Sequence, residues 1–512
     1  MIDPAPVRAA VGHGARCPCR PGRVLASPTV TASPEPVPHP VLPARPPFTL
    51  RARVLTPTDA GGTDFHQDGI VVVDAAGRIA WVGSTADFEA VRPSGGEVPA
   101  SSATARPPVT DIRPLVVMPG MVDLHAHLPQ LPNAGLGAGL DLLAWLRRYI
   151  FPLEQRFADE GDAAALAPAA FRAFASVGTT TVLAYGAVYA ASMNEAFRAA
   201  EAHGIRAILG KVMMDRITYD ETIDPATILD QSLRESEELC TRWHGAAEGR
   251  LGYAVTPRFA VSCTAEMLRA SADLAARTGA WWQTHVSEDP GEIAEVARLF
   301  PEARDYVDVY DRAGGLGPRT VLAHAVHLTD RELARLVESD TRVAHCPASN
   351  LFLASGIMPL ARYLEAGLGI GLGSDVAGGP DPSMFSVMRV GAYAQNARRT
   401  LLGETNPSLG PLDWIRMGTL AGATALGLDD RIGSIEAGKD ADIIAIDAGL
   451  TAPMRHADLG APAHEPIDVD PADIASRLIF RPHPDMVRAS WVRGQSLAGP
   501  GMGSSIRGTA GD

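Results

Sequence analysis

Residues 320–350 read TVLAHAVHLTDRELARLVESDTRVAHCPASN, and this stretch holds one full repeat of the pattern from which the fold can be predicted. Its two ends, TVLAHAVHL and TRVAHCPASN, are short apolar runs with β-branched residues, as expected of buried strands. The middle, TDRELARLVES, is rich in leucine, glutamate and arginine, as expected of a helix. The stretch therefore predicts a strand, a helix and a second strand in succession.

The same alternation extends in both directions, from about residue 117 to residue 425. Helix-like stretches separate eight strand-like runs: GMVDLHAH (120–127), GTTTVLAYG (178–186), RAILGKVMM (206–214), LGYAVTPRF (251–259), AWWQTHVSE (280–288), TVLAHAVHL (320–328), TRVAHCPASN (341–350) and GIGLGSD (369–375). Eight successive strand–helix pairs predict an α/β fold, a (β/α)₈ barrel of the TIM type. A doubly wound α/β sheet is the alternative, but the glycine-rich phosphate loop that usually follows its first strand is missing.

The two ends of the chain differ from the middle. Residues 48–116 and 426–498 contain short β-branched runs punctuated by glycine and aspartate. We expect these segments to be the two parts of one small β-sandwich domain beside a catalytic barrel of residues 117–425. Residues 1–47 are rich in proline, alanine and arginine, and residues 499–512 in glycine and serine. Both of these terminal stretches are expected to be disordered.

The composition excludes several classes of protein. A formal net charge of −14 argues against a nucleic-acid-binding protein, which needs a basic surface. The sequence lacks an apolar run of about 18 residues, so we expect no membrane span, and its N-terminus lacks the apolar core of a secretory signal. The five scattered cysteines imply no disulfide framework, and a cytoplasmic location is expected.

Residues able to bind a metal ion stand at the ends of the apolar runs. His125 and His127 end the first run, His285 lies near the end of the fifth, and Asp375 ends the eighth. Because all barrel strands open with their C-terminal ends on one face, these four side chains are expected to meet there. Three imidazoles and a carboxylate suit zinc, with iron or manganese as alternatives. A hydrogen-bonded core histidine explains any one of them alone, but not the whole set at four strand ends.

Two further residues are candidates for proton transfer. Glu288 follows His285 by three positions, and a free carboxylate beside a metal-activated water is the usual general base. The alternative is a solvated glutamate that opens the next helix. His324, in the sixth run, would hydrogen-bond the attacking water or the developing charge. His327 and His345 are more simply explained as structural residues.

Several motifs resemble the amidohydrolase superfamily in their order and spacing. They are PGMVDLHAH, THVSE, LAHAVHLTD, AHCPASN and GLGSDVAGG. Within that superfamily, LLAWLRRYIFPLEQRF, GKVMMD, TPRFAVSC, ASNLFLASG and DVAGG are similar to segments of the guanine deaminases. The resemblance covers roughly residues 110–445, and its most specific motifs are TPRF, NLFLASG and DVAGG.

The resemblance implies hydrolytic deamination of guanine to xanthine and ammonia, with a metal-activated water attacking C2. Glu288 would move the proton of the water to the ring and then to the departing amine. His324 and Asp375 would orient the nucleophile, so these three residues are the expected catalytic set.

The same motif match implies which residues contact the purine. Gln130 and Arg258 would recognise the ring edges, since a guanidinium offers donors to a carbonyl oxygen and an amide can both donate and accept. Phe259 would line the base pocket, and His285 and Glu288 would also contact the substrate. The alternative for Arg258 is an ion pair with a carboxylate of the barrel.

The cofactor implied by the resemblance is one Zn²⁺ per chain, with Fe²⁺ as an alternative. Binuclear hydrolases of this design carry a carboxylated lysine at the end of the fourth strand, where this sequence has Thr256-Pro257-Arg258-Phe259. Lys211 and Lys439 are the only two lysines, so a single metal is expected. The partner would be a small-molecule purine, with no nucleic acid and no membrane, and the resemblance suggests a homodimer.

Two other functions remain open from the sequence. One is another amidohydrolase that acts on 8-oxoguanine, a pterin or a triazine. The other is a catalytically dead barrel that serves as a scaffold, although such proteins usually lose a ligand. Two stretches depart from the family pattern: Pro380-Asp381-Pro382, on a loop expected to touch the substrate, and the acidic residues 461–474.

Overall fold

Two β-sheets organise the computed structural model, which describes residues 41–91, 108–217, 222–452 and 470–497. The predicted disordered extension as far as residue 40 and the predicted tail of residues 499–512 lie outside the described residues. Most of the atypical acidic stretch does so as well. None of the helices in the described part of the chain combines the length and the apolar character needed to cross a bilayer.

The larger sheet is the predicted barrel. Its strands follow one another in chain order and pair in parallel: β5 (Met121–His127), β6 (Thr179–Tyr185), β7 (Arg206–Gly210), β9 (Leu251–Pro257), β10 (Trp281–Val286), β11 (Thr320–His324), β12 (Arg342–His345) and β13 (Ile370–Leu372). A two-residue strand, β8 (Val212–Met213), pairs with β9 beside this path. All eight predicted runs thus form strands, and the predicted fold class is confirmed.

Backbone hydrogen bonds join the first strand to the segment after the last one. The Asp375 N–H donates to the His125 carbonyl oxygen at 2.7 Å, and the His127 N–H donates to that of Val376 at 3.0 Å. These bonds fix the end of the eighth strand against the end of the first.

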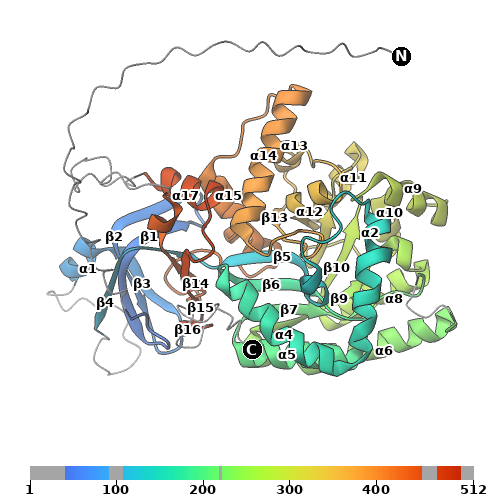
Figure 1. The fold of residues 1–512 in the computed structure, drawn as a ribbon, viewed down its shortest axis with the longest axis horizontal. Coiled ribbons are helices and arrows are strands. Elements are labelled where there is room, and N and C mark those ends of the chain that lie inside the picture. The colour runs from blue at the N-terminus through green and yellow to red at the C-terminus, as the bar shows by residue number, and fades with distance from the viewer. Residues whose placement is uncertain (1–40, 92–107, 218–221, 453–469, 498–512) are drawn as a thin grey trace, which may run out of the picture. The chain divides into compact units, whose positions relative to one another are not determined.

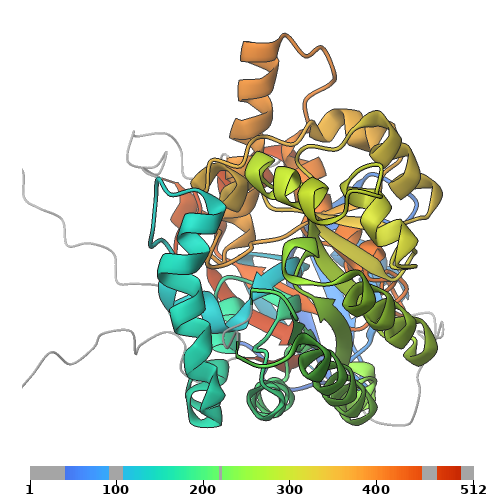
Figure 2. The same ribbon diagram turned by 90° about the vertical axis from the view of Figure 1, so that its right-hand side faces the viewer.

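Helices surround the barrel strands, as Figure 2 shows. The helical segments between and after the strands are η1 (Leu128–Asn133), α2 (Leu142–Trp145), η2 (Leu146–Ile150), α3 (Phe151–Glu154), η3 (Gln155–Ala158), α4 (Glu160–Ser176), α5 (Ala190–His203), α6 (Pro225–Trp243), α7 (Ala246–Gly249), η4 (Ala260–Ser262), α8 (Ala265–Thr278), α9 (Pro290–Leu299), α10 (Tyr306–Arg312), α11 (Asp330–Glu338), α12 (Pro347–Phe352), α13 (Leu360–Glu365), α14 (Met384–Leu402), α15 (Pro411–Met417) and α16 (Leu420–Ala425). Side-chain caps fix several of their starts, such as the Thr329 capping box at α11.

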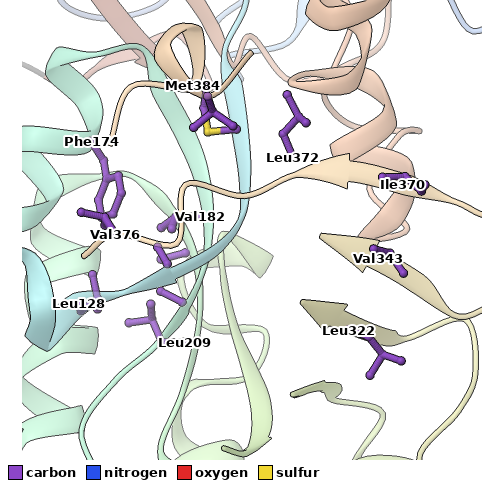
Figure 3. Packing of buried hydrophobic residues seen from close by; sticks show 14 of the residues in the cluster. Leu128, Phe174, Val182, Leu209, Leu322, Val343, Ile370, Leu372, Val376 and Met384 are labelled. Atoms are coloured by element: carbon purple, nitrogen blue, oxygen red, sulfur yellow. The ribbon is translucent and has the colours of Figure 1, made fainter. Parts of the chain in front are cut away.

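Alternate residues of each barrel strand enter two different hydrophobic layers. Val182 and Leu322 belong to the outer layer, which packs against the helices, whereas their neighbours Leu183 and Val321 belong to the barrel interior. Figure 3 shows part of the outer layer, including Val182, Leu322 and Phe174 of α4. Because both faces of the strands are covered, the strands read as continuous apolar runs in the sequence.

The smaller sheet is built from both ends of the chain. Its seven strands lie in the order β16 (Gln495–Ser496), β15 (Val487–Val492), β14 (Ile443–Ile446), β4 (Val109–Pro119), β1 (Phe48–Pro57), β2 (Thr63–Val73) and β3 (Ile79–Ser84). In Figure 1 the blue N-terminal strands lie beside the orange-red C-terminal ones. Two helical segments contact this sheet: α1 (Thr85–Val91) lies against β2 and β3, and η5 (Ala448–Thr451) against β4. The helix α17 (Pro471–Phe480) packs against α14, α15 and η5.

The start of the described chain is attached to this smaller sheet. The carbonyl oxygen of Pro43 accepts a hydrogen bond from Trp491 Nε1, and that of Ala44 accepts one from the Ser496 N–H. The domain boundaries at residues 47, 116, 425 and 498 stay predictions.

A buried arginine connects the two sheets. Arg206, at the start of β7, is 1% exposed. Its Nε donates to Asp442 Oδ2 and its Nη2 to Asp440 Oδ2, both at 2.9 Å, just before β14. Arg431 and Arg493 also contact Asp440, and these cations hold the pKa of Asp440 below its usual value despite the opposing effect of burial.

We predict that Arg206→Ala lowers the free energy of unfolding by about 3–5 kcal/mol, because it leaves two buried carboxylates without their central cation. The midpoint of urea denaturation measures this loss. The matched control is Arg198→Ala, which removes an exposed pair with Glu195 and should cost less than about 1 kcal/mol. Equal losses in the two variants would contradict the role of Arg206 as the connection between the sheets.

Candidate active site

The four predicted metal ligands lie together at the C-terminal ends of the barrel strands. His125 and His127 project from the same side of β5, because they are two residues apart on a strand. Their Nε2 atoms lie 3.1 Å and 3.2 Å from Asp375 Oδ1. His285 Nε2, from β10, lies 3.3 Å from His127 Nε2. All four side chains are buried.

His324 adjoins the same cluster. Its Nε2 lies 3.4 Å from Glu288 Oε2 and 3.8 Å from Asp375 Oδ2. Ligand atoms of His125, His285, His324 and Asp375 all lie within 4.8 Å of one another, so this set also has the dimensions of a metal site. The histidine positions therefore allow two overlapping sets of four, which share three members.

The protonation of the imidazoles suits a cation. His285 Nδ1 lies 2.6 Å from the carbonyl oxygen of Arg258, and since a carbonyl only accepts, Nδ1 carries the proton and Nε2 presents its lone pair. Burial lowers the pKa of His125 to about 4, so its imidazole is neutral at pH 7. His125 Nε2 is buried and lies 3.1 Å from Asp375 Oδ1, but it makes no hydrogen bond of good geometry with the described residues. The lone pairs of these two Nε2 atoms are therefore available to coordinate a divalent metal ion.

The two carboxylates of the site have opposite tendencies. Burial alone would raise the pKa of Asp375, but the adjacent imidazoles, His125 foremost, hold it well below its usual range. Burial and the charge of Asp375 raise the pKa of Glu288 well above its usual range. One carboxylate is thus kept as an anion, while the other is suited to take up a proton.

The backbone is strained where it presents these side chains. Ser287, His324 and Asp375 have φ values of 47°, 72° and 48°, in the left-handed region that residues other than glycine rarely adopt. Such strain is characteristic of functional sites. Gly373 is required for another reason, since a Cβ there would lie 2.7 Å from that of His125.

Asp123 forms hydrogen bonds with residues next to the metal-ligand cluster. It is fully buried on β5, and its carboxylate accepts hydrogen bonds from Ser374 N at 2.9 Å and Ser374 Oγ at 2.6 Å. It also accepts from the His125 N–H at 3.2 Å. Burial raises the pKa of Asp123 to about 7, partly offset by the bonds from Ser374. Asp123 therefore fixes Asp375 and His125 relative to each other.

A cavity opens in front of the cluster. It is lined by His127, Gln130, Leu142, Trp145, Leu146, Arg258, Phe259, His285, Glu288, Leu353 and Asp375. The structure thus brings the predicted substrate-contacting residues, Gln130, Arg258 and Phe259, to the same space as Glu288. His125 and His324 are not among the residues that line it.

The apolar wall of this cavity was not predicted from the sequence. Leu142, Trp145 and Leu146 follow one another at the helical spacing i, i+3, i+4, which places them on one face of the helical segment 142–154. That spacing was a detectable signal within LLAWLRRYIFPLEQRF, although it did not show which surface the face would cover. Glu154, at the end of the same segment, was also missed.

The loop after Asp375 carries the proline-flanked Asp381. Asp381 accepts hydrogen bonds from Ser383 N at 2.9 Å and Ser386 Oγ at 2.7 Å, so it holds this loop against the first turn of α14. Pro380, Asp381 and Pro382 are not among the residues that line the cavity. Contact between this loop and the substrate stays a prediction.

The end of the fourth strand has no second metal ligand. Thr256, at that position, accepts a hydrogen bond from Gln283 Nε2 at 2.9 Å. Lys211 is buried beside β8 and forms an ion pair with Glu235 at 3.3 Å. His327 Nε2 bonds to the Ser355 carbonyl oxygen at 2.7 Å, as suits a structural histidine.

Comparison with known proteins gives concordant matches. The sequence matches the amidohydrolase family over residues 116–495. It is 41% identical over 378 residues to the probable guanine deaminase of Deinococcus radiodurans, covering 74% of this chain and 82% of that protein. It is 34% identical over 393 residues to the guanine deaminase of Escherichia coli, covering 77% and 84%.

Solved structures agree with these sequence matches. The E. coli guanine deaminase has a TM-score of 0.76 and 29% identity, covering 88% of this chain and 98% of that one. A guanine deaminase from C. acetobutylicum, with guanine bound in its active site, has a TM-score of 0.76 and 27% identity, covering 88% and 99%. The sequence and the fold of this chain are therefore both similar to those of guanine deaminases.

We predict that Asp123→Ala weakens metal binding by about 10–100-fold, as loss of a supporting carboxylate typically does. Competition with a chromophoric chelator measures the affinity. The control is Asp215→Ala, which removes another buried carboxylate, one that accepts from Thr264 N and Oγ1. An Asp123 variant with the parent's metal affinity would show that Asp123 does not support the site.

Proposed function

The chain belongs to the amidohydrolase family, and we propose that it hydrolyses guanine to xanthine and ammonia. One observation carries this proposal beyond family membership. Glu288, Gln130 and Arg258 line the same cavity as His285 and Asp375, so a proton-transfer group and two ring-recognition groups surround the imidazole–carboxylate cluster. Because all the expected metal-binding and proton-transfer residues are present together, we do not favour the alternative of a catalytically dead scaffold.

We propose that His125, His127, His285 and Asp375 hold one divalent cation, zinc or alternatively iron. When bound, such a cation acidifies water and so supplies a hydroxide nucleophile near neutral pH. Two features of the fourth strand end support a single ion. Thr256 accepts a hydrogen bond from Gln283 there, and this strand end has no lysine that could bridge two metals.

Glu288 is proposed as the group that moves protons. The elevated pKa of its buried carboxyl suits a residue that takes a proton from water and later releases it. The oxygen of the water forms a bond to C2 of guanine, and the proton passes from Glu288 to the ring nitrogen. The remaining proton of the added hydroxyl then passes, through Glu288, to the exocyclic amine. The C2–N bond breaks, ammonia leaves and C2 keeps the oxygen as the carbonyl of xanthine.

His324 and Asp375 are proposed to orient the nucleophile. His324 Nδ1 lies 2.9 Å from Asn350 Oδ1, which fixes the ring, and its Nε2 faces Glu288 and Asp375. Their positions beside Glu288 support a role in directing the attack rather than in binding the purine.

Gln130 and Arg258 are proposed to bind the polar edge of the purine, while apolar side chains contact its faces. Trp145 and Phe259 are the aromatic residues of the cavity lining and supply the broad surfaces that a flat ring needs. A homodimer and a cytoplasmic location stay predictions from the sequence.

The direct test is a panel of substrates on purified chain of known metal content. We expect guanine to yield xanthine and stoichiometric ammonia, and adenine, cytosine and 8-oxoguanine to be poor substrates. Ultraviolet absorbance and an ammonia-coupled assay follow the reaction. Efficient turnover of 8-oxoguanine, a pterin or a triazine, with none of guanine, would overturn the substrate while leaving the family assignment intact.

Glu288→Gln is the control that links this activity to the site. The amide keeps the size of the carboxyl but cannot accept a proton, so kcat should fall by about 10²–10⁴-fold. Metal content should equal that of the parent. A variant with full activity would exclude Glu288 as the proton carrier.

A further inference from the structure

A buried carboxylate joins the two residues proposed to recognise the purine. Glu154, the last residue of α3, is 3% exposed. One of its oxygens accepts a hydrogen bond from Gln130 Nε2 at 2.7 Å, and the other accepts from Arg258 Nη1 at 2.6 Å. Gln130 lies on η1 after the first barrel strand and Arg258 follows the fourth, so Glu154 holds together groups from distant parts of the chain.

This contact determines which end of the Gln130 amide faces the cavity. A carboxylate has only acceptor atoms, so the amide atom directed at Glu154 must be the NH₂ group. The other end, Gln130 Oε1, is buried and has no hydrogen-bond partner among the described residues. Since Gln130 lines the cavity, this orphaned oxygen is available to a ligand as an acceptor.

Arg258 presents the opposite character. A guanidinium has donors and no acceptor, so anything it offers to a ligand is an N–H group. The guanidinium of Arg258 also lies over the ring of Phe151, with 5.4 Å between its Cζ and the ring centroid. This cation–π contact further limits the positions that the Arg258 side chain can adopt. The cavity therefore combines an acceptor from Gln130 with a donor from Arg258, both fixed by one carboxylate.

That pair is complementary to a ring N–H beside a carbonyl, which is the lactam edge of a 6-oxopurine. A 6-aminopurine offers the reverse, a ring nitrogen that accepts beside an amino group that donates. We propose that Glu154 is a positioning residue that sets the preference for the lactam edge by fixing the orientation of the Gln130 amide. The identity of the ligand class rests on the proposed function.

Glu154→Gln tests this orientation without changing the size of the side chain. Arg258 can only donate, so the new amide would turn its oxygen toward Arg258 and its NH₂ toward Gln130. Gln130 would then rotate to accept from that NH₂, and its own NH₂ would face the ligand. The variant should therefore lose affinity for a 6-oxopurine and gain relative affinity for a 6-aminopurine.

The measurement is isothermal titration calorimetry on the metal-loaded full chain with hypoxanthine and adenine. Neither carries a 2-amino group, so the binding is read without deamination at C2. We expect the parent to prefer hypoxanthine and the ratio of dissociation constants to move at least about tenfold toward adenine in Glu154→Gln, since a buried donor or acceptor left without its partner costs about that much. Metal content should not change.

Two matched experiments separate positioning from mere stability. Glu332→Gln removes another buried carboxylate, which caps α11, and should leave the ratio unchanged. In a Gln130→Met background, Glu154→Gln should shift the ratio no further, because the residue through which it acts is gone. A shift of equal size in that background would overturn the proposed route through Gln130.

A Glu154→Gln chain that loses affinity for both bases equally would reduce Glu154 to an ion-pair partner of Arg258 and overturn the proposal. This outcome is distinct from failure of the proposed function. A parent that prefers hypoxanthine but releases no ammonia from guanine would overturn the reaction and leave the role of Glu154 standing. A parent that deaminates guanine, with an unchanged ratio in the variant, would overturn only the role of Glu154.

Discussion

The site depends on the hydrogen bonds that close the barrel between β5 and the segment after β13. His125 and Asp375 come from opposite sides of this closure, and the Asp375 N–H donates directly to the His125 carbonyl oxygen at 2.7 Å. Asp123 adds a buried side-chain link to Ser374 across the same seam. Without closure, the two imidazoles of β5 and the carboxylate of Asp375 would belong to different edges of an open sheet. The geometry of the cluster is therefore a consequence of the fold.

The side of the cavity that we propose to recognise the purine is held in place by a separate helical segment. The helical segment 142–154 contributes Leu142, Trp145 and Leu146 to the cavity wall and ends at Glu154, which binds Gln130 and Arg258. One segment thus shapes the apolar wall and orients the polar groups beside it. Its π-helical turn, Leu146–Ile150, lies between these two parts, as such turns often do near functional sites.

The sequence predicted the barrel and the cluster because their signals are local. Each buried strand is a continuous apolar run, and His125, His127, His285 and Asp375 stand at strand ends, which a barrel gathers on one face. Glu154 could not be found this way, since it ends a helix whose placement over the cavity is set by tertiary packing. The orientation of the Gln130 amide likewise depends on a neighbour 24 positions away.

Three imidazoles and one carboxylate at these strand ends are proposed to hold a single metal ion. Metal analysis combined with X-ray absorption spectroscopy at the metal edge tests this proposal. We expect one ion per chain, nitrogen and oxygen ligands at about 2.0–2.2 Å, and an imidazole scattering pattern. A second metal at about 3.5–4 Å, or a chain that binds no stoichiometric metal, would contradict it.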